Sequence, residues 1–311
     1  MVDNMRKQGV VQPSVSPWAS PIVLVPKKDR TYRFCIDFHR LNAVTKKDVY
    51  PLPRIDDILD TLGESKFFSS LDLASGYWQV ELDPESRQKS TFTTYCGLFE
   101  FVRMPFGLCN ASATFQRLMQ KVLAGLEWHT YFVYLDDILV TFRSFDELLQ
   151  HLREVFMRLQ DAGLRLKPCK CSLLRDEVPF LSHIISTEGV RPDPAKIEKV
   201  QRYPTPTDAT QVRQFLGLAS YHRRFMPAFA KVSAPLRALT KKNATFLWTA
   251  ECETAFIELK HLLTTAPVLA YPRFGPDRSF VLETDASGIG LGAVLSQVQD
   301  DGVIHCIGYA V

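Results

Sequence analysis

Hydrophobic and polar positions follow two different periodicities along this chain. Short runs rich in aromatic and β-branched residues predict strands, and apolar residues spaced three and four apart predict helices. Strands are expected at 22–25, 34–36, 66–73, 77–82, 89–95, 98–104, 180–185, 279–284, 289–297 and 303–309. Helices are expected at 54–62, after Asn110, at 144–162, after Asp193, at 211–225 and at 251–263. This order predicts an α+β fold with antiparallel strands that are covered on one face.

The most informative stretch is a pair of acidic residues between two apolar runs. Thr130–Tyr134 and Ile138–Phe142 predict two strands joined by a hairpin turn that carries Asp136 and Asp137. Two ionised carboxylates at the tip of an otherwise buried hairpin repel each other, and without a cation one of them would take up a proton. A hard divalent ion resolves this conflict and also serves phosphoryl transfer. The alternative is a solvated acidic turn.

A second acidic position favours the metal interpretation. Asp72 directly follows the apolar run Phe67–Leu71, so it lies at the tip of another strand. If that strand lay beside the hairpin, two divalent ions could bridge Asp72 and Asp136, with Asp137 as a supporting ligand. One ion would lower the pKa of a primer 3′-hydroxyl, and the other would hold the triphosphate. The alternative is an aspartate that only hydrogen-bonds at a strand end.

Composition indicates a globular protein and leaves several classes of function open. The chain has 311 residues, enough for two or more domains, with 46% hydrophobic and 23% charged residues. No apolar run reaches the ~18 residues of a membrane span, and Met1–Lys7 lacks the apolar core of a secretory signal. We therefore expect an intracellular protein, cytoplasmic or nuclear, that is neither secreted nor bound to a membrane.

Charge and cysteine content add little by themselves. The net charge of +3 is only weakly basic, so nucleic-acid binding would have to come from local clusters. The seven cysteines are scattered, and the spacing of Cys169 and Cys171 does not match the usual zinc motifs. Reduced structural thiols are the interpretation that this pattern favours.

Several longer motifs occur in one order around the three aspartates. They are Ser16–Pro21, Asp37–Asn42, Tyr50–Arg54, Phe67–Gln79, Met104–Leu108 and Tyr134–Asp137. With these motifs the chain resembles the reverse transcriptase of gypsy-type long-terminal-repeat retrotransposons, over nearly its whole length. A set of long motifs in a fixed order is far more specific than an acidic pair.

The resemblance implies a right-hand polymerase followed by a truncated ribonuclease H-like β segment. Fingers and palm would cover residues 1–178, thumb and connection 179–270, and the ribonuclease H-like fragment 271–311. Asp72, Asp136 and Asp137 would be the catalytic, metal-binding triad, with Mg²⁺ as the ion and Mn²⁺ as an alternative. The implied partners are an RNA or DNA template with its primer, deoxynucleoside triphosphates, and the remainder of a Pol polyprotein.

The same resemblance assigns residues to the nucleotide site. Tyr77 matches an aromatic steric gate, whose ring leaves no space for a 2′-hydroxyl; the alternative is an ordinary core tyrosine. The triphosphate would be gripped by Lys27 or Lys28 together with Arg33, for which a solvated basic turn is the alternative. Phe106 would lie beside the nucleotide and Gln116 near the template path, although both fit packing roles equally well.

The implied thumb carries two further features. Phe180–His183 resembles the hairpin that positions the primer end, but the family usually has glycine where this chain has Ser182. If that position needs a positive φ, serine would be strained there. Lys196, Lys199 and Arg202 recur every three residues and would share one helix face. That face would contact duplex phosphates or simply be solvated.

The last strands resemble the start of a ribonuclease H domain. The similarity covers Phe280–Ser287 and the run 288–296, and Asp285 matches the first metal-binding carboxylate. Ribonuclease H chemistry needs several carboxylates around two metal ions. We therefore predict no autonomous ribonuclease H activity from a chain that stops at Val311.

Three functions remain as hypotheses. The leading one is an RNA-directed DNA polymerase, able also to copy DNA, that extends a primer with deoxynucleotides by two-metal phosphoryl transfer. The second is a non-catalytic retroelement relic that binds nucleic acid, which the shortened tail and Ser182 favour. The third is an RNA-copying polymerase that uses ribonucleotides, and Tyr77 argues against it.

Overall fold

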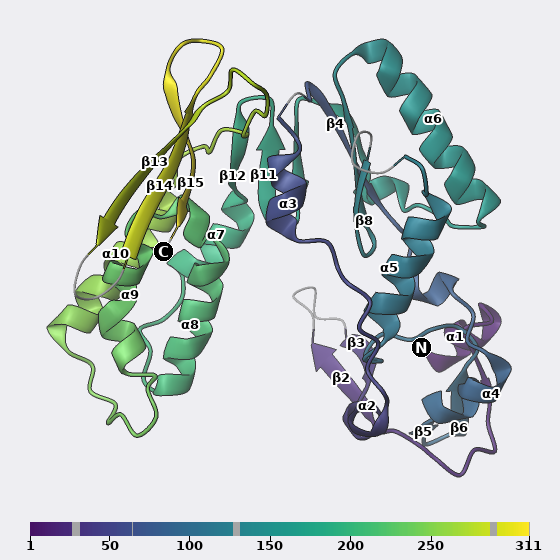
Figure 1. Cartoon of the computed structure of the whole chain (residues 1–311). Helices are drawn as coiled ribbons and strands as arrows, with labels where there is room; N and C mark the ends of the chain where they lie inside the picture. Colours follow the sequence, from purple (N-terminus) through teal and green to yellow (C-terminus); the bar gives the residue numbers. More distant parts are fainter. Residues whose placement is uncertain (27–31, 64, 127–130, 287–290, 311) are drawn as a thin grey trace. The chain divides into compact units, whose positions relative to one another are not determined.

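The computed structural model describes all residues except 27–31, 64, 127–130, 287–290 and 311 (Figure 1). The described chain forms two compact units that interleave along the sequence. The first contains Met1–Arg54, Ser69–Val140 and Asp146–Leu173, and the second contains Ile55–Phe68, Thr141–Phe145 and Leu174–Val311.

Up to residue 175 the elements alternate between short helices and strands. In order they are α1 Val2–Lys7, β1 Val11–Pro13, β2 Ile22–Pro26, β3 Tyr32–Ile36, α2 His39–Val44, α3 Ile55–Asp60, β4 Phe67–Asp72, the 3₁₀ helix η1 Gly76–Gln79, α4 Pro84–Arg87, η2 Gln88–Ser90, β5 Phe92–Thr94, β6 Gly97–Phe101, α5 Ala111–Val122, β7 Tyr131–Tyr134, β8 Asp137–Phe142, α6 Phe145–Asp161, η3 Pro168–Lys170 and β9 Ser172–Arg175.

The later elements are β10 Glu177–Phe180, β11 His183–Ser186, β12 Gly189–Pro192, α7 Pro194–Gln201, α8 Ala209–Tyr221, η4 Arg223–Phe225, α9 Phe229–Ala238, α10 Ala250–Thr264, β13 Phe280–Ala286, β14 Leu291–Val298 and β15 Ile304–Ala310. Mixed helices and strands confirm the α+β class.

A four-stranded sheet in the order β7-β8-β4-β9 positions the acidic residues. Strand β4 lies next to β8, as expected for a strand that brings Asp72 beside the acidic hairpin. Strands β4 and β8 bury nearly all their apolar side chains, while helix α6 turns Leu148, Leu152, Val155 and Leu159 inward. In Figure 1 this helix runs beside the same strands. The sheet is thus a rigid base with carboxylates at its end.

The N-terminal part of the first unit has its own small core. Strand β6 pairs with both β1 and β5, and β2 forms a separate hairpin with β3. Buried apolar side chains gather between α1 and the β1-β6-β5 sheet, namely Met5, Val10, Val11, Ile36, Phe38, Phe92, Phe99 and Phe101. Burial of aromatic side chains of this size is a main source of folding free energy.

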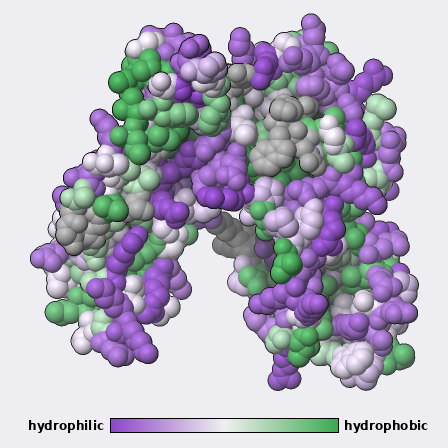
Figure 2. Space-filling view, viewed as in Figure 1, coloured by the Kyte–Doolittle hydropathy of each residue, from purple (hydrophilic) through white to green (hydrophobic). Residues whose placement is uncertain are grey.

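The second unit combines a helical core with two antiparallel sheets. Helices α7 to α10 surround buried side chains that include Val212, Phe215, Phe229, Phe256 and Leu259. The sheets have the orders β10-β11-β12 and β13-β14-β15. All of β13 is exposed, and apolar atoms gather over this last sheet at the upper left of Figure 2.

Arg224 connects three elements of the second unit. Its guanidinium lies 3.1 Å from Asp56 Oδ1 and 2.9 Å from Asp60 Oδ1, both on α3. The same guanidinium donates to the Ile307 carbonyl of β15. An arginine fork suits such simultaneous contacts because its planar donors are fixed relative to one another.

The structure corrects several predicted elements. The expected strand 77–82 begins instead as helix η1, because Ser75 adopts a left-handed conformation (φ 53°) that turns the chain after Ala74. The expected strand 180–185 is a tight hairpin in which Phe180 pairs with His183. Helices α1, α2, α4 and α9 are not predicted from the sequence; α9 contains Pro235, and proline usually breaks a helix.

No helix among the described residues is both long and apolar enough to cross a bilayer.

Gly189 allows the chain after α10 to pair with strand β12. Val190 and Leu269 exchange backbone hydrogen bonds of 2.8 Å, and Gly189 has φ +142°. A Cβ at this glycine would lie 2.1 Å from the Leu269 carbonyl oxygen. Both the backbone conformation and the close approach therefore require glycine.

We predict that Gly189→Ala lowers the free energy of unfolding by about 2 kcal/mol or more. Gly217→Ala is the matched control: it lies in helix α8 with no atom within 4 Å of an added Cβ, and it is expected to stabilise by about 0.5–1 kcal/mol. Urea denaturation of both variants measures the two changes. Equal effects would contradict the assigned role of Gly189.

Candidate active site

The acidic hairpin turns within two residues. Tyr134 pairs with Asp137, so Leu135 and Asp136 form the turn. Leu135 has φ 59°, a conformation that non-glycine residues rarely adopt. The turn is supported by Gln116 of α5, whose Oε1 accepts from the Leu135 N–H at 2.8 Å and whose Nε2 donates to the Val133 carbonyl. The buried Gln116 amide thus supports the left-handed backbone of Leu135, and the resulting turn places Asp136 at the tip of the hairpin.

Gln116 packs against the acidic hairpin, which is compatible with the packing role. Its side chain is fully buried, and its amide atoms are occupied by the hairpin backbone. Its place near the template path stays a prediction.

Asp72 at the end of β4 forms an ion pair with Lys170. The Lys170 Nζ lies 2.8 Å from Asp72 Oδ2, and the Asp72 side chain is only 19% exposed. This hydrogen bond raises the pKa of Lys170, partial burial opposes the shift, and the charges of Asp72, Asp136 and Asp137 add to it. All three carboxylates therefore favour the charged form of this ammonium group.

This electrostatic arrangement suits a divalent cation. Carboxylate oxygens are the ligands that Mg²⁺ prefers, and a cationic group already lies against Asp72. Among the described side chains, no three of histidine, cysteine, aspartate and glutamate gather closely enough to hold an ion together. The donor chemistry fits a metal site, and the side chains would have to approach one another to complete it.

Tyr77 lies directly beside the acidic turn. A Cβ added at neighbouring Gly76 would lie 3.3 Å from the Asp136 Cβ, so η1 packs closely against the turn. The Tyr77 ring contacts Phe106 and Phe115 at centroid distances of 5.1 and 5.4 Å, and its hydroxyl lies 2.9 Å from Ser112 Oγ. Burial raises the pKa of Tyr77, the Ser112 bond opposes this, and the charge of Asp136 adds to it.

The backbone beside Asp72 is fixed by a second glutamine. Gln79 donates to the carbonyls of Ala74 and Arg165 and accepts from the Arg165 N–H at 2.6 Å. The Lys167 N–H in turn donates to the Asp72 carbonyl at 2.8 Å. These bonds tie the segment that carries Lys170 to both η1 and the end of β4.

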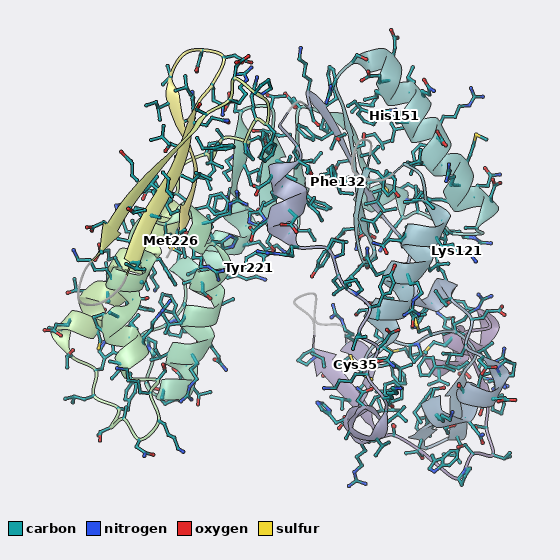
Figure 3. The ribbon with its side chains drawn as sticks, in the orientation of Figure 1. Cys35, Lys121, Phe132, His151, Tyr221 and Met226 are labelled. Atoms are coloured by element: carbon teal, nitrogen blue, oxygen red, sulfur yellow. The ribbon has the colours of Figure 1, made fainter. Side chains whose placement is uncertain are left out.

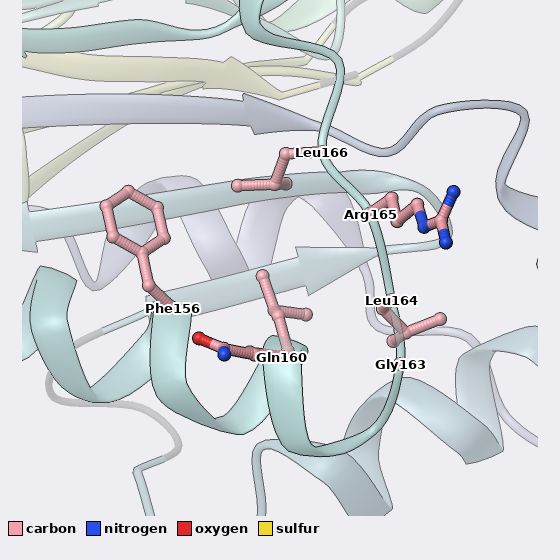
Figure 4. A pocket seen from close by; sticks show the side chains of 7 residues that line it. Phe156, Gln160, Gly163, Leu164, Arg165 and Leu166 are labelled. Atoms are coloured by element: carbon pink, nitrogen blue, oxygen red, sulfur yellow. The ribbon is translucent and has the colours of Figure 1, made fainter.

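An apolar cavity of about 460 Å³ lies between the end of α6 and the segment that follows it. Figure 4 shows Phe156 of α6 and Leu166 of the following segment facing it. It is lined by Phe156, Leu159, Gln160, Gly163, Leu164, Arg165 and Leu166. The acidic residues do not line it, so it is separate from the candidate active site.

The other predicted nucleotide-binding residues are only partly described. Arg33 lies exposed on β3, and Phe106 is 52% exposed beside Tyr77. Lys27 and Lys28 lie outside the described residues. The placement of Phe106 next to Tyr77 is compatible with a pocket wall, and its role stays a prediction.

The predicted primer-positioning hairpin has two residues with positive φ. They are Leu181 at 46° and Ser182 at 65°, so the position where the family usually has glycine does need a left-handed backbone. The Leu181 carbonyl accepts a 2.8 Å hydrogen bond from the Tyr221 hydroxyl at the end of α8. Tyr221 is labelled in Figure 3. This bond holds the strained turn to the helical part of the second unit.

Two buried histidines lie at the same hairpin: His183 is part of it, and His222 follows the end of α8. The His183 ring packs against Tyr221, His222 and Phe225 at centroid distances of 5.4–5.7 Å. Within the described part of the chain, the buried Nδ1 of each histidine has no hydrogen-bond partner. Burial lowers the pKa of both imidazoles to about 4, and for His183 the nearby His222 adds to the shift. Both rings therefore serve as neutral aromatic packing groups at pH 7.

The remaining predicted residues are exposed. Lys196 and Lys199 lie on α7, and Arg202 at its end pairs with Glu198 at 2.6 Å. Asp285 is exposed on β13, opposite Gly292. Among the residues that the structure describes, no contact defines a role for Lys196, Lys199 or Asp285, and the absence of autonomous ribonuclease H activity stays a prediction.

Sequence reasoning missed Lys170 and Ser112. Lys170 follows Asp72 by 98 positions, and Ser112 follows Tyr77 by 35. Periodicity does not connect positions so far apart. The only local signal for Lys170 was the proline-initiated turn Lys167–Cys171, which indicates a fixed backbone but no partner.

Comparison with known proteins identifies the class. The family described as "Reverse transcriptase (RNA-dependent DNA polymerase)" matches residues 25–185, and an "RNase H-like domain found in reverse transcriptase" matches residues 248–311. Because the first match covers more than half of the chain, the protein belongs to the reverse transcriptase family.

Two relatives with similar sequences are Pol polyproteins of retrotransposons. The chain is 43% identical over 303 residues to the "Retrovirus-related Pol polyprotein from transposon 297" of Drosophila melanogaster, covering 95% of the chain and 28% of that protein. It is 38% identical to the corresponding gypsy polyprotein of Drosophila melanogaster, covering 95% and 30%. The resemblance to gypsy-type elements is confirmed, and the chain spans less than a third of these relatives.

Solved structures agree with this assignment. The foamy viral protease-reverse transcriptase in complex with double-stranded DNA has a TM-score of 0.86 and 27% identity, covering 99% of this chain and 54% of that one. The same viral protein in complex with an RNA/DNA hybrid has a TM-score of 0.84 and 27% identity, covering 99% and 41%. The right-hand polymerase fold expected from the sequence is thereby confirmed.

The buried histidines generate a pH prediction. In the folded chain their pKa is about 4, below the ordinary histidine value of 6.5 that holds in the unfolded chain. As the pH falls, the unfolded chain therefore binds protons at a higher pH than the folded chain does. Stability is therefore fully present above pH 6.5 and decreases toward pH 4, by on the order of 2 kcal/mol. The groups that bear on the two rings include Arg224, Asp56 and Asp193.

Urea denaturation between pH 7 and pH 4.5 measures this loss. The variant His222→Phe keeps an aromatic ring and should show a shallower pH dependence than wild type. His261→Phe, at an exposed site on α10, should keep the wild-type dependence. Parallel curves for wild type and His222→Phe would contradict the role of the buried imidazoles.

Proposed function

We propose that this chain is an RNA-directed DNA polymerase, also able to copy DNA, that extends a primer with deoxynucleotides. The observation that carries the proposal is the placement of Asp72 at the end of β4 and of Asp136 and Asp137 at the β7–β8 turn of the same sheet. Family membership supports it, as do the foamy viral relatives bound to double-stranded DNA and to an RNA/DNA hybrid.

The three aspartates would hold the divalent ions of the reaction. When bound there, Mg²⁺ or Mn²⁺ supplies charge that makes a 3′-hydroxyl more acidic and offsets the negative charge of the triphosphate and its leaving group. The protein's own contribution is orientation: Gln116 fixes the turn that carries Asp136, and Gln79 fixes the segment beside Asp72. Asp137 is the first residue of β8 and supplies a further carboxylate directly after Asp136.

Tyr77 would select deoxynucleotides. Its ring is held between Phe106 and Phe115, and its hydroxyl is positioned by Ser112. A ring fixed in this way next to Asp136 cannot easily move aside for a 2′-hydroxyl. Phe106 and Arg33 would complete the nucleotide site, together with Lys27 and Lys28.

Nucleic acid would be bound through exposed cations of the second unit. Lys196 and Lys199 are exposed on α7, where phosphate contacts would be independent of sequence and sensitive to salt. Arg202 would have to exchange its pairing with Glu198 for a phosphate. The hairpin Phe180–His183 would position the primer end.

Replacement of a single carboxylate tests the catalytic assignment. Asp136→Asn should reduce primer extension on an RNA template roughly 100-fold or more, because loss of a metal ligand exceeds the 10–100-fold cost of losing an outer partner. The assay uses a DNA primer, Mg²⁺ and deoxynucleotides. Asp161→Asn, at the exposed end of α6, is the control and should extend normally.

The assignment fails if wild type and Asp136→Asn extend the primer at the same rate. Filter binding at several salt concentrations accompanies the assay, because a protein that binds nucleic acid but never extends a primer would be the non-catalytic relic.

Nucleotide selection provides a separate prediction. Tyr77→Ala removes the ring and should increase incorporation of ribonucleotides relative to deoxynucleotides roughly tenfold or more. Single-nucleotide extension with each nucleotide type measures this ratio. Tyr95→Ala, at a fully exposed tyrosine, is the control and should leave the ratio unchanged; an unchanged ratio in Tyr77→Ala would exclude the steric gate.

A further inference from the structure

Lys170, which is distant in sequence from the three aspartates, forms an ion pair with one of them, Asp72. Lys170 is the last residue of η3, and its Nζ lies 2.8 Å from Asp72 Oδ2. The Asp72 side chain is mostly buried, whereas the lysine side chain is 54% exposed. A charge-assisted hydrogen bond of this length to a shielded carboxylate is stronger than a surface ion pair.

The backbone that carries Lys170 is anchored to the strand that carries Asp72. The Lys167 N–H donates to the Asp72 carbonyl at 2.8 Å, and the Lys170 N–H donates to the Lys167 carbonyl at 2.9 Å. The lysine Cα is therefore held within reach of the carboxylate, and only the side chain has to rotate to make or break the pair. Such pre-organisation lowers the entropy cost of the contact.

The local charge explains why a cation is needed. Asp72 pairs with the Lys170 ammonium, and the β7–β8 turn of the same sheet carries Asp136 and Asp137, whose charges also raise the pKa of Lys170. Like charges in a partly desolvated space repel strongly. Lys170 relieves part of this repulsion with an atom that belongs to the chain itself.

We infer that Lys170 is a built-in counter-ion that occupies Asp72 until a divalent ion displaces it, and that it thereby sets how tightly the carboxylate site binds metal. The inference rests on the proposed function, since it assumes that Asp72 is a metal ligand. A divalent ion and the Lys170 ammonium need the same Asp72 oxygen, so they compete. Removing the lysine charge removes the competitor.

The test measures Mn²⁺ binding to the intact chain, without nucleic acid or nucleotide, from the loss of the free-ion electron paramagnetic resonance signal. We expect Lys170→Met to bind Mn²⁺ about tenfold more tightly than wild type, the effect of one charge-assisted hydrogen bond. Lys170→Arg, which keeps the charge, should not bind more tightly. The Mg²⁺ concentration for half-maximal primer extension should fall in parallel in Lys170→Met.

Lys167→Met is the matched control, because it removes an exposed lysine three residues earlier in the chain. It should bind Mn²⁺ like wild type, apart from a small general effect of charge. Equal affinity of wild type and Lys170→Met overturns the inference. Equal tightening in Lys170→Met and Lys167→Met also overturns it, since net charge alone would then account for the change.

Asp72→Asn separates this inference from the proposed function. If it binds Mn²⁺ as tightly as wild type, the proposed metal site itself is wrong. If it binds Mn²⁺ more weakly while Lys170→Met is unchanged, the metal site stands and only the role of Lys170 falls. Circular dichroism of each variant establishes that it is folded.

Discussion

Mutual repulsion of three carboxylates is the constraint on which the first unit depends. Asp72 ends β4, Asp136 stands in the β7–β8 turn and Asp137 begins β8. Placing them at one end of a sheet costs free energy, because each charge loses water and faces like charges. The Lys170 ammonium, held against Asp72, offsets part of this cost.

Neutral amides supply the rigidity around this charged space. Gln116 holds the backbone of the acidic turn, and Gln79 holds the segment 165–167 against η1. A glutamine can donate and accept at once, so it fixes a backbone without adding charge to a site whose charge is its function. The positive φ of Leu135 persists because the buried Gln116 amide supports it.

In the second unit, two buried histidines pack at the hairpin turn formed by Leu181 and Ser182. His183 and His222 are buried as neutral rings between Tyr221 and Phe225. The positive φ of Leu181 and Ser182 is stabilised by the bond from Tyr221 to the Leu181 carbonyl. Here a tyrosine hydroxyl together with aromatic packing, rather than an amide, supports a strained hairpin.

The sequence determined a good part of this protein. The acidic hairpin, the strand that ends at Asp72, helices α5, α6 and α10, and the family itself could be read from local patterns, because alternation, spacing and ordered motifs are properties of neighbouring residues. The capping aspartate of α7 was readable for the same reason: Asp193 accepts from the Ala195 N–H next to Pro194.

Only the tertiary structure decided which groups meet. Lys170 reaches Asp72 across 98 positions, Ser112 orients Tyr77, and Gln116 turns inward to the hairpin. Helix α9 forms in spite of Pro235 because its apolar face packs into the helical core. Such contacts depend on how the elements pack together, and packing is a property of the folded chain that no local pattern encodes.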